Sequence, residues 1–95
     1  MNKYELTLVV NASVEEEVRN AAFEQTRELI VKNGGTITDP GTPEKKRLAY
    51  EIQKMNEGYY AFIKFEAPAD APAEIEGRLR ITANILRFLI VREGE

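Results

Sequence analysis

The sequence contains no cysteine and no histidine. The chain therefore has no disulfide, no thiolate nucleophile and no imidazole base, and it lacks the side chains that bind zinc and most transition metals. It also has no basic start followed by an apolar segment of about 7 to 15 residues, and no apolar run of about 18 residues. We expect a cytoplasmic protein with no metal, no cofactor, no secretion signal and no membrane span.

Positive charge is also in short supply. Among the 95 residues, 13 Lys and Arg stand against 16 Asp and Glu, which gives a net charge of −3. This charge opposes strong non-specific attraction to DNA, to RNA or to a membrane surface. The length and the 43% hydrophobic content predict one globular domain, residues 1–95. If this domain binds nucleic acid, it does so through a local patch or with a partner's help.

Groups that carry catalysis are scarce as well. Ser13 is the single serine of the chain, and its spacing from Glu16 is that of a helix capping box. The three consecutive acids Glu15, Glu16 and Glu17 would lie in the first turn of that helix, where they complement the helix dipole in water. No glycine-rich anion-binding loop precedes the helix. We expect a protein that is not an enzyme.

The first half of the chain predicts a strand, a helix and a second strand. Residues 3–10 alternate with a period of two, and Ser13 begins a helix that ends at the glycine-containing stop of residues 33–35. A stripe about 100° wide predicts that the helix packs on the sheet through Val14, Val18, Ala21, Ala22, Gln25 and Leu29. Phe23 and Ile30 fall outside this stripe and are interpreted as flanking core residues, with a partner contact as the alternative. A second strand begins at Thr36.

The second half predicts a hairpin, a helix and a last strand. Pro40 and Pro43 interrupt the strand that begins at Thr36, so residues 39–44 are expected to form a loop or a bulged edge. Asp70 is the expected cap of the second helix, which packs through Ile75, Leu79 and Ile81. The remaining elements are expected as a strand over 45–53, a turn over 56–58, a strand over 59–66, a helix over 73–80 and a strand over 85–92.

This order predicts an α+β, ferredoxin-like βαββαβ fold, in which a four-stranded antiparallel sheet carries both helices on one face. Alternation assigns to the helix side Leu6, Leu8, Ala61, Ile63, Phe65, Leu86, Phe88 and Ile90. The opposite side, called the open face below, receives Thr7, Val9, Tyr60, Phe62, Lys64, Arg87, Leu89 and Val91. The open face is too apolar for plain exposure to solvent.

Aromatic residues on the open face allow two interpretations. RNA-recognition modules of the same topology stack bases on aromatic side chains of their central strands, and Tyr60 and Phe62 lie on the matching strand. The first strand, however, presents no aromatic residue on this face, and the basic-Gly-aromatic-Gly-aromatic consensus of those modules is missing. The pair therefore favours a patch covered by a partner over a base-stacking platform.

Basic residues gather in two places despite the net negative charge. Lys45, Lys46 and Arg47 are consecutive in the sequence. The second group surrounds the predicted connection between the last helix and the last strand and consists of Arg78, Arg80, Arg87 and Arg92. With Lys3, the two groups would form a phosphate-binding surface if they converge along one sheet edge, and would otherwise be solvated strand ends. Phosphate contacts suit a structured RNA better than a specific DNA site.

Several short motifs are more specific than any periodicity requires. The segment over 46–52 reads Lys-Arg-Leu-Ala-Tyr-Glu-Ile. It is accompanied by Tyr4-Glu5, Gly58-Tyr59-Tyr60, Leu79-Arg80 and Asn84-Ile85-Leu86-Arg87. In these motifs, from Met1 to about Arg92, the chain resembles the bacterial small-subunit ribosomal protein S6 family.

The resemblance implies a structural component of the small ribosomal subunit that binds the central domain of 16S ribosomal RNA. It also implies a heterodimer with small-subunit ribosomal protein eighteen (S18), a small basic protein that would supply the positive charge lacking here. Within matching motifs, Tyr4, Lys46, Arg47 and Arg87 are candidates for contact with RNA or the partner. The complete set of candidates is Lys3, Tyr4, Lys45, Lys46, Arg47, Tyr60, Phe62, Arg80, Arg87 and Arg92.

Two other classes of function are compatible with the same residues. One is a homodimeric ferredoxin-like interaction module, which would pair its own edge strands or open faces. The other is an autonomous RNA-recognition-like module, which would depend on Phe62 and need no partner.

Overall fold

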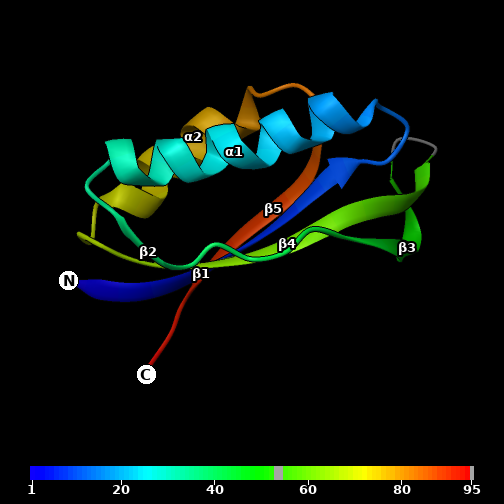
Figure 1. Cartoon of the computed structure of the whole chain (residues 1–95). Coiled ribbons are helices and arrows are strands. Elements are labelled where there is room, and N and C mark those ends of the chain that lie inside the picture. The colour runs from blue at the N-terminus through cyan, green and yellow to red at the C-terminus, as the bar shows by residue number, and fades with distance from the viewer. Residues whose placement is uncertain (53–54, 95) are drawn as a thin grey trace.

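The alternating and helical segments of the sequence form a sheet with two helices on one side (Figure 1). The computed structural model describes residues 1–52 and 55–94, without the side chains of Ala49 and Met55. The elements in chain order are β1 (Asn2–Asn11), α1 (Glu16–Lys32), β2 (Thr36–Asp39), β3 (Glu44–Ile52), β4 (Met55–Ala67), α2 (Ala71–Arg80) and β5 (Ile85–Arg92).

The sheet is antiparallel, and five strands fill four positions in it. Its order is β2-β4-β1-β5, and β3 pairs with the same edge of β4 that β2 uses further along. The 13-residue β4 is long enough for both partners because the pairing of β2 ends opposite Lys64 and that of β3 begins opposite Tyr60. The predicted α+β ferredoxin-like arrangement, with both helices on one face, is confirmed.

The hydrophobic core lies between this sheet and the helices. The two central strands supply its floor, with Leu6 and Leu8 from β1 and Ile63 and Phe65 from β4 at 0–1% exposure. These are residues that alternation assigns to the helix side. Burying side chains of this size contributes about 1.5–3 kcal/mol each relative to exposure, so the inward face of the sheet is a main source of stability.

The inward face of α1 differs from the predicted one. The helix is buried through Ala22, Phe23, Thr26 and Ile30, whereas Val18 is 40% exposed and Ala21 and Gln25 face solvent. The interpretation of Phe23 and Ile30 as core residues is confirmed, and Ala22 and Leu29 of the predicted stripe also pack on the core. The stripe was wrong for Val18, Ala21 and Gln25, because the helix turns toward the sheet the side that carries the bulky Phe23 and Ile30, which gain the most from burial. Thr26 is tolerated in the core because its hydroxyl donates a hydrogen bond of 2.8 Å to the Ala22 carbonyl.

The helix boundaries are also shifted. The first helix begins at Glu16, two residues later than the Ser13 cap predicts, and the Ser13 amide donates a 2.8 Å hydrogen bond to Asn11 Oδ1 in the preceding turn. The α1 start is anchored instead by Arg19, whose guanidinium lies 4.0 Å from the centre of the Tyr59 ring and donates to the Val14 carbonyl. The second helix begins at Ala71, directly after the predicted cap residue Asp70. Ile81, predicted to pack, is 77% exposed.

The predicted turn over 56–58 is wrong. These residues belong to β4, which begins at Met55, and Met55 pairs with Ile52 of β3. Gln53, predicted to end the preceding strand, lies outside the described residues. Gly58 is needed for close packing rather than for a turn, because a Cβ there would lie 2.6 Å from Val9 Cγ1.

One register irregularity changes the inward face of β5. Val9 pairs with Arg87 and Val10 with Ile85, so Leu86 is the extra residue of a bulge. Ile85, Phe88 and Ile90 pack against the core, and Leu86, assigned by alternation to the helix side, is not part of that cluster. A bulge of one residue breaks the strict period of two on which the assignment depends.

Two glycines with opposite environments test this packing. A Cβ at Gly77, in the middle of α2, would meet no atom within 4 Å, so Gly77→Ala should raise the free energy of unfolding by about 0.5–1 kcal/mol. Gly58→Ala, the matched substitution in β4, should lower it because Val9 must shift. Chemical denaturation of both variants measures the two changes, and equal effects would contradict the packing described for Gly58.

Candidate partner and RNA interface

The open face has the residues that alternation predicts, in register across the sheet. Phe62, Thr7 and Leu89 form one row across β4, β1 and β5, and Lys64, Glu5 and Val91 form the next. Phe62 is 43% exposed, Leu89 52% and Val91 44%. No described helix covers this side of the sheet (Figure 1). The result is an exposed apolar band on a charged protein, which is the usual mark of an interaction site.

Part of the open face is already covered by the chain itself. Val9, predicted to be uncovered, is only 1% exposed. It packs against Gly58, and Leu48 of β3, itself 8% exposed, lies over the same spot. The apolar surface available to a partner is therefore shifted away from Val9 toward Phe62, Leu89 and Val91.

The aromatic pair carries a cation from its own chain. The ammonium of Lys46 lies 5.5 Å from the centre of the Phe62 ring and 6.0 Å from that of Tyr60. Both distances are within the range of cation–π attraction. Of the three consecutive basic residues, Lys46 faces the open face, while Lys45 forms a 4.0 Å ion pair with Glu57 and Arg47 lies opposite Glu57 in register.

A second cation stands at the β5 side of the open face. The Arg87 guanidinium donates a 2.8 Å hydrogen bond to the hydroxyl of Tyr50, a side chain that is 60% exposed. The two residues are 37 positions apart in the sequence and come from β3 and β5. This contact joins the strand at one edge of the sheet to the strand at the other, across the open face.

The loop between β2 and β3 closes the gap in the β4 edge. Residues 40–43 run beside Phe62, and a Cβ on Gly41 would lie 2.6 Å from the Phe62 carbonyl oxygen. Gly41 has φ +73°, which glycine adopts without strain, and its amide donates a 2.9 Å hydrogen bond to Asp39 Oδ1. The loop thus lies directly on the β4 backbone.

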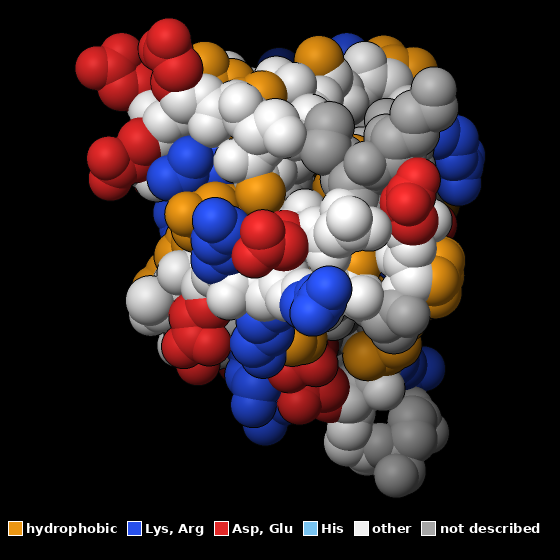
Figure 2. Space-filling view, turned by 90° about the vertical axis from the view of Figure 1, so that its right-hand side faces the viewer, with side chains coloured by type: hydrophobic (Ala, Val, Ile, Leu, Met, Phe, Trp, Pro, Cys, Tyr) orange, Lys and Arg blue, Asp and Glu red, His pale blue; other side chains and the backbone are white. Residues whose placement is uncertain are grey.

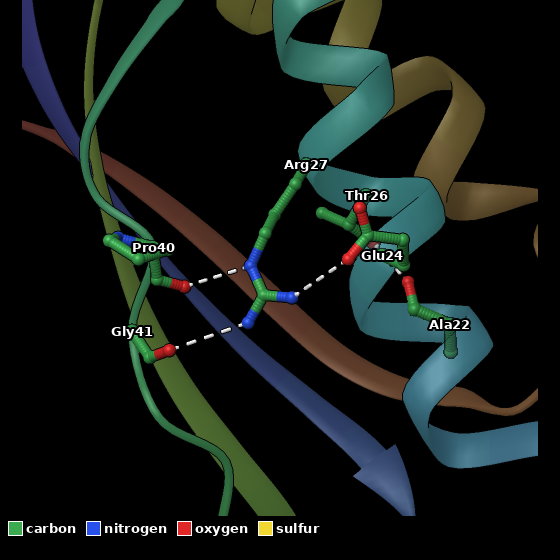
Figure 3. Close-up of polar contacts among 6 residues, drawn as sticks. All are labelled: Ala22, Glu24, Thr26, Arg27, Pro40 and Gly41. Atoms are coloured by element: carbon green, nitrogen blue, oxygen red, sulfur yellow. Dashed lines mark hydrogen bonds and ion pairs between the residues drawn. The ribbon is translucent and has the colours of Figure 1, made fainter. Parts of the chain in front are cut away.

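Arg27 of α1 holds this loop (Figure 3). Its Nε donates to the Pro40 carbonyl at 3.0 Å, and its Nη2 donates to the Gly41 carbonyl at 3.4 Å. The third nitrogen, Nη1, faces Glu24 Oε2 at 3.4 Å. The guanidinium therefore uses its planar fork on two consecutive carbonyls, an arrangement that a lysine ammonium does not reproduce.

Loop and aromatic pair together line a hollow on the open face. Tyr60 and Phe62 contribute aromatic rings, Lys46 an ammonium, and Asp39 and Glu44 carboxylates; the other lining residues are Gly41 and Thr42. Apolar surface and charges of both signs lie side by side here. Such a surface fits a protein partner better than a bare polyanion.

The two basic groups do not converge along one edge, so the condition for one shared phosphate-binding surface is not met. The strand order places β3 and β5 at opposite edges, and Lys3 lies with Arg92 at the far end of the sheet from Arg87. Arg80 is on α2, 4.0 Å from Glu76. At the end of the molecule where β3 meets β4, Lys and Arg side chains alternate with Asp and Glu (Figure 2). The basic residues are therefore spread over both edges of the sheet and α2 and do not form one large positive patch.

Tyr4 is a core residue and is removed from the contact candidates. It is 7% exposed, and its ring stacks on Phe65 with 5.5 Å between the ring centres. Its hydroxyl accepts a 3.1 Å hydrogen bond from Asn2 Nδ2. The Tyr4 ring packs in the core, so it is not exposed for contact with RNA.

Sequence reasoning missed Tyr50, Leu48 and Arg27 as parts of this surface. The alternation of β3 places Leu48 and Tyr50 on one side, which was a usable signal, but the contact with Arg87 depends on the strand order. Nothing in the sequence around Arg27 indicates that it holds a loop.

Within residues 1–52 and 55–94, no group of three or more acidic side chains is placed to hold a metal ion, and no helix is long and apolar enough to cross a membrane.

Comparison with known proteins gives one consistent result. The family model described as ribosomal protein S6 matches residues 3–92. A protein of Alkaliphilus oremlandii, named small ribosomal subunit protein bS6, is 44% identical over 97% of both chains, and its namesake in Caldanaerobacter subterraneus is 41% identical over 100% of both. The crystal structure of 30S ribosomal protein S6 from Thermotoga maritima is similar with a TM-score of 0.87 at 30% identity, covering 97% of this chain and 87% of that one.

The placement of Tyr4 can be tested by stability. Tyr4→Ala should lower the free energy of unfolding by about 3–5 kcal/mol, because a large buried ring is lost. Tyr4→Phe keeps the stacking on Phe65 and should cost no more than about 1 kcal/mol. Urea denaturation gives both values. A stable Tyr4→Ala variant would contradict the core position.

Proposed function

Since the matches extend over nearly its whole length, the chain belongs to the ribosomal protein S6 family, and from this premise we propose that it binds the central domain of 16S ribosomal RNA together with S18. The family is structural and not enzymatic, and its named members are proteins of the small subunit of the cytoplasmic ribosome. What we propose beyond family membership is that the chain binds RNA jointly with a partner and that the partner is S18.

The observation that carries the proposal is the exposed apolar band on the open face. Phe62, Leu89 and Val91 are about half exposed on a chain whose core is otherwise well covered. A second layer over this band would bury it as the helices bury the other face. Thr7 of β1 lies between Phe62 and Leu89 in one row, and Val91 is in the next row, so one partner surface can cover all three apolar side chains.

The charge distribution supports a basic partner. The net charge of −3 opposes binding to RNA by this chain alone, whereas it favours association with a basic protein. In the complex the partner supplies most of the phosphate contacts. The cations of this chain that flank the band, Lys46 and Arg87, would add a few more.

A gel-shift titration on a central-domain RNA fragment tests the proposal directly. Binding should require S18 and should weaken steeply between two salt concentrations. Binding of this chain by itself with undiminished affinity would instead favour an autonomous RNA-recognition-like module. A dimer of the isolated chain at micromolar concentration that excludes S18 would favour the homodimeric alternative.

The docking face is tested with a matched pair of variants in the same titration. Leu89→Asp places a charge in the apolar band and should weaken joint binding at least tenfold, because an unpaired charge would be buried under the partner. Ile81→Asp makes the same change on an exposed residue outside the open face and should leave the affinity unchanged. Equal affinities of the two variants would exclude the open face as the docking site.

Arg87 is the best-defined candidate for a phosphate contact. Arg87→Ala should reduce the magnitude of the negative slope of log affinity against log salt by about 0.7–0.9, the effect of one phosphate contact. It should change the free energy of unfolding by no more than about 0.5 kcal/mol. Tyr50→Phe removes the hydrogen bond to Arg87 but keeps the charge, so it should leave the slope unchanged. An unchanged slope in Arg87→Ala would remove this residue from the contact surface.

A further inference from the structure

We infer that Arg27, a residue of the helix layer, positions the β2–β3 loop and thereby sets the shape of the binding surface on the opposite side of the sheet. The inference rests on the proposed function, since it concerns the same open face. It assigns a role to a side chain that touches neither the apolar band nor any of the predicted contact residues.

The first step is the contact itself. The Arg27 side chain is only 20% exposed and lies against the loop rather than extending into solvent. Its two hydrogen bonds end on the carbonyls of Pro40 and Gly41, consecutive residues in the middle of the loop (Figure 3). Because Glu24 occupies the remaining guanidinium nitrogen, the orientation of the fork is fixed from both sides.

The second step is the hydrogen bonding of the loop backbone within the part of the chain that the structure describes. Pro40 and Pro43 have no backbone N–H to donate, and the Gly41 amide is used within the loop, on Asp39 Oδ1. Neither β2 nor β3 pairs with β4 at Phe62, where the loop passes. Arg27 supplies two hydrogen bonds that tie the middle of the loop to another element of the fold.

The third step links the loop to the open face. Gly41 lies on the backbone of Phe62, and Gly41 and Thr42 line the hollow that contains the two aromatic rings. Three residues after Gly41, β3 begins with Glu44, and Lys46 follows over the rings. A displaced loop would change the wall of the hollow and the position of the Lys46 ammonium.

The consequence is a preorganised interface. A surface that is already ordered before binding loses less conformational entropy on association than one that must order a loop. Removing the contacts of Arg27 should therefore weaken joint binding of S18 and RNA without direct loss of a contact to either. The strength of the effect depends on the hydrogen-bonding fork and not on the charge.

The test compares four proteins, the wild type, Arg27→Lys, Arg27→Gln and Lys32→Gln. The measurements are the affinity for the RNA fragment in the presence of S18, its salt dependence, and amide hydrogen exchange of Gly41 and Thr42 in the isolated full chain. Arg27→Lys keeps the charge but not the fork, and Lys32→Gln removes an equal charge from an exposed residue in the last turn of the same helix.

Both Arg27 variants should bind at least fivefold more weakly, with an unchanged salt slope and with faster exchange of the two loop amides. Lys32→Gln should change neither the loop exchange nor the affinity. Wild-type affinity and exchange in Arg27→Lys would overturn the inference, because the charge alone would then suffice. If the wild type itself binds no RNA with S18, the proposed function fails, while unchanged exchange in Arg27→Gln would separately refute the hold of Arg27 on the loop.

Discussion

The structure depends on the fact that two helices can cover only one face of its sheet. The helix side of the central strands is fully packed at Leu6, Leu8, Ile63 and Phe65, while β4 and β5 also carry Phe62, Leu89 and Val91 on the other face. The opposite side must find its cover elsewhere. How that second face is covered decides both the local structure of the sheet edge and the way in which the protein associates.

The chain covers one part of this face with its own segments. Leu48 lies over Val9, the loop of residues 40–43 lies on the backbone of Phe62, and Arg87 reaches Tyr50 across the face. The four-residue β2 and the nine-residue β3 pair with the edge of β4, and the loop with its two prolines lies between them, which leaves no long unpaired edge on β4. The second part of the face, the band of Phe62, Leu89 and Val91, stays exposed in the isolated chain.

The net charge of the chain, like the apolar band, favours association with a protein over direct binding of a polyanion. A net negative chain gains little from a polyanion, but it can associate with a basic protein and add a few well-placed cations to the joint surface. Membership in the ribosomal protein S6 family is consistent with this division, in which a structural protein contributes shape and a docking face and no catalytic group. The positions of Lys46 and Arg87 on opposite sides of the band follow from the strand order rather than from their spacing in the chain.

The sequence by itself determined the α+β class, the strand alternation of β1 and β4, and the apolar character of the open face, because these depend on the local periods of 2 and 3.6. Its motifs also indicated the family. It did not determine the inward side of α1, the bulge at Leu86 or the role of Gly58, since these depend on which side chains meet across the fold. Alternation with Leu6 and Leu8 already pointed Tyr4 to the helix side, but the sequence could not show that Tyr50 bonds to Arg87 or that Arg27 holds the β2–β3 loop. Those contacts join residues that are distant in the chain, and only the tertiary structure brings them together.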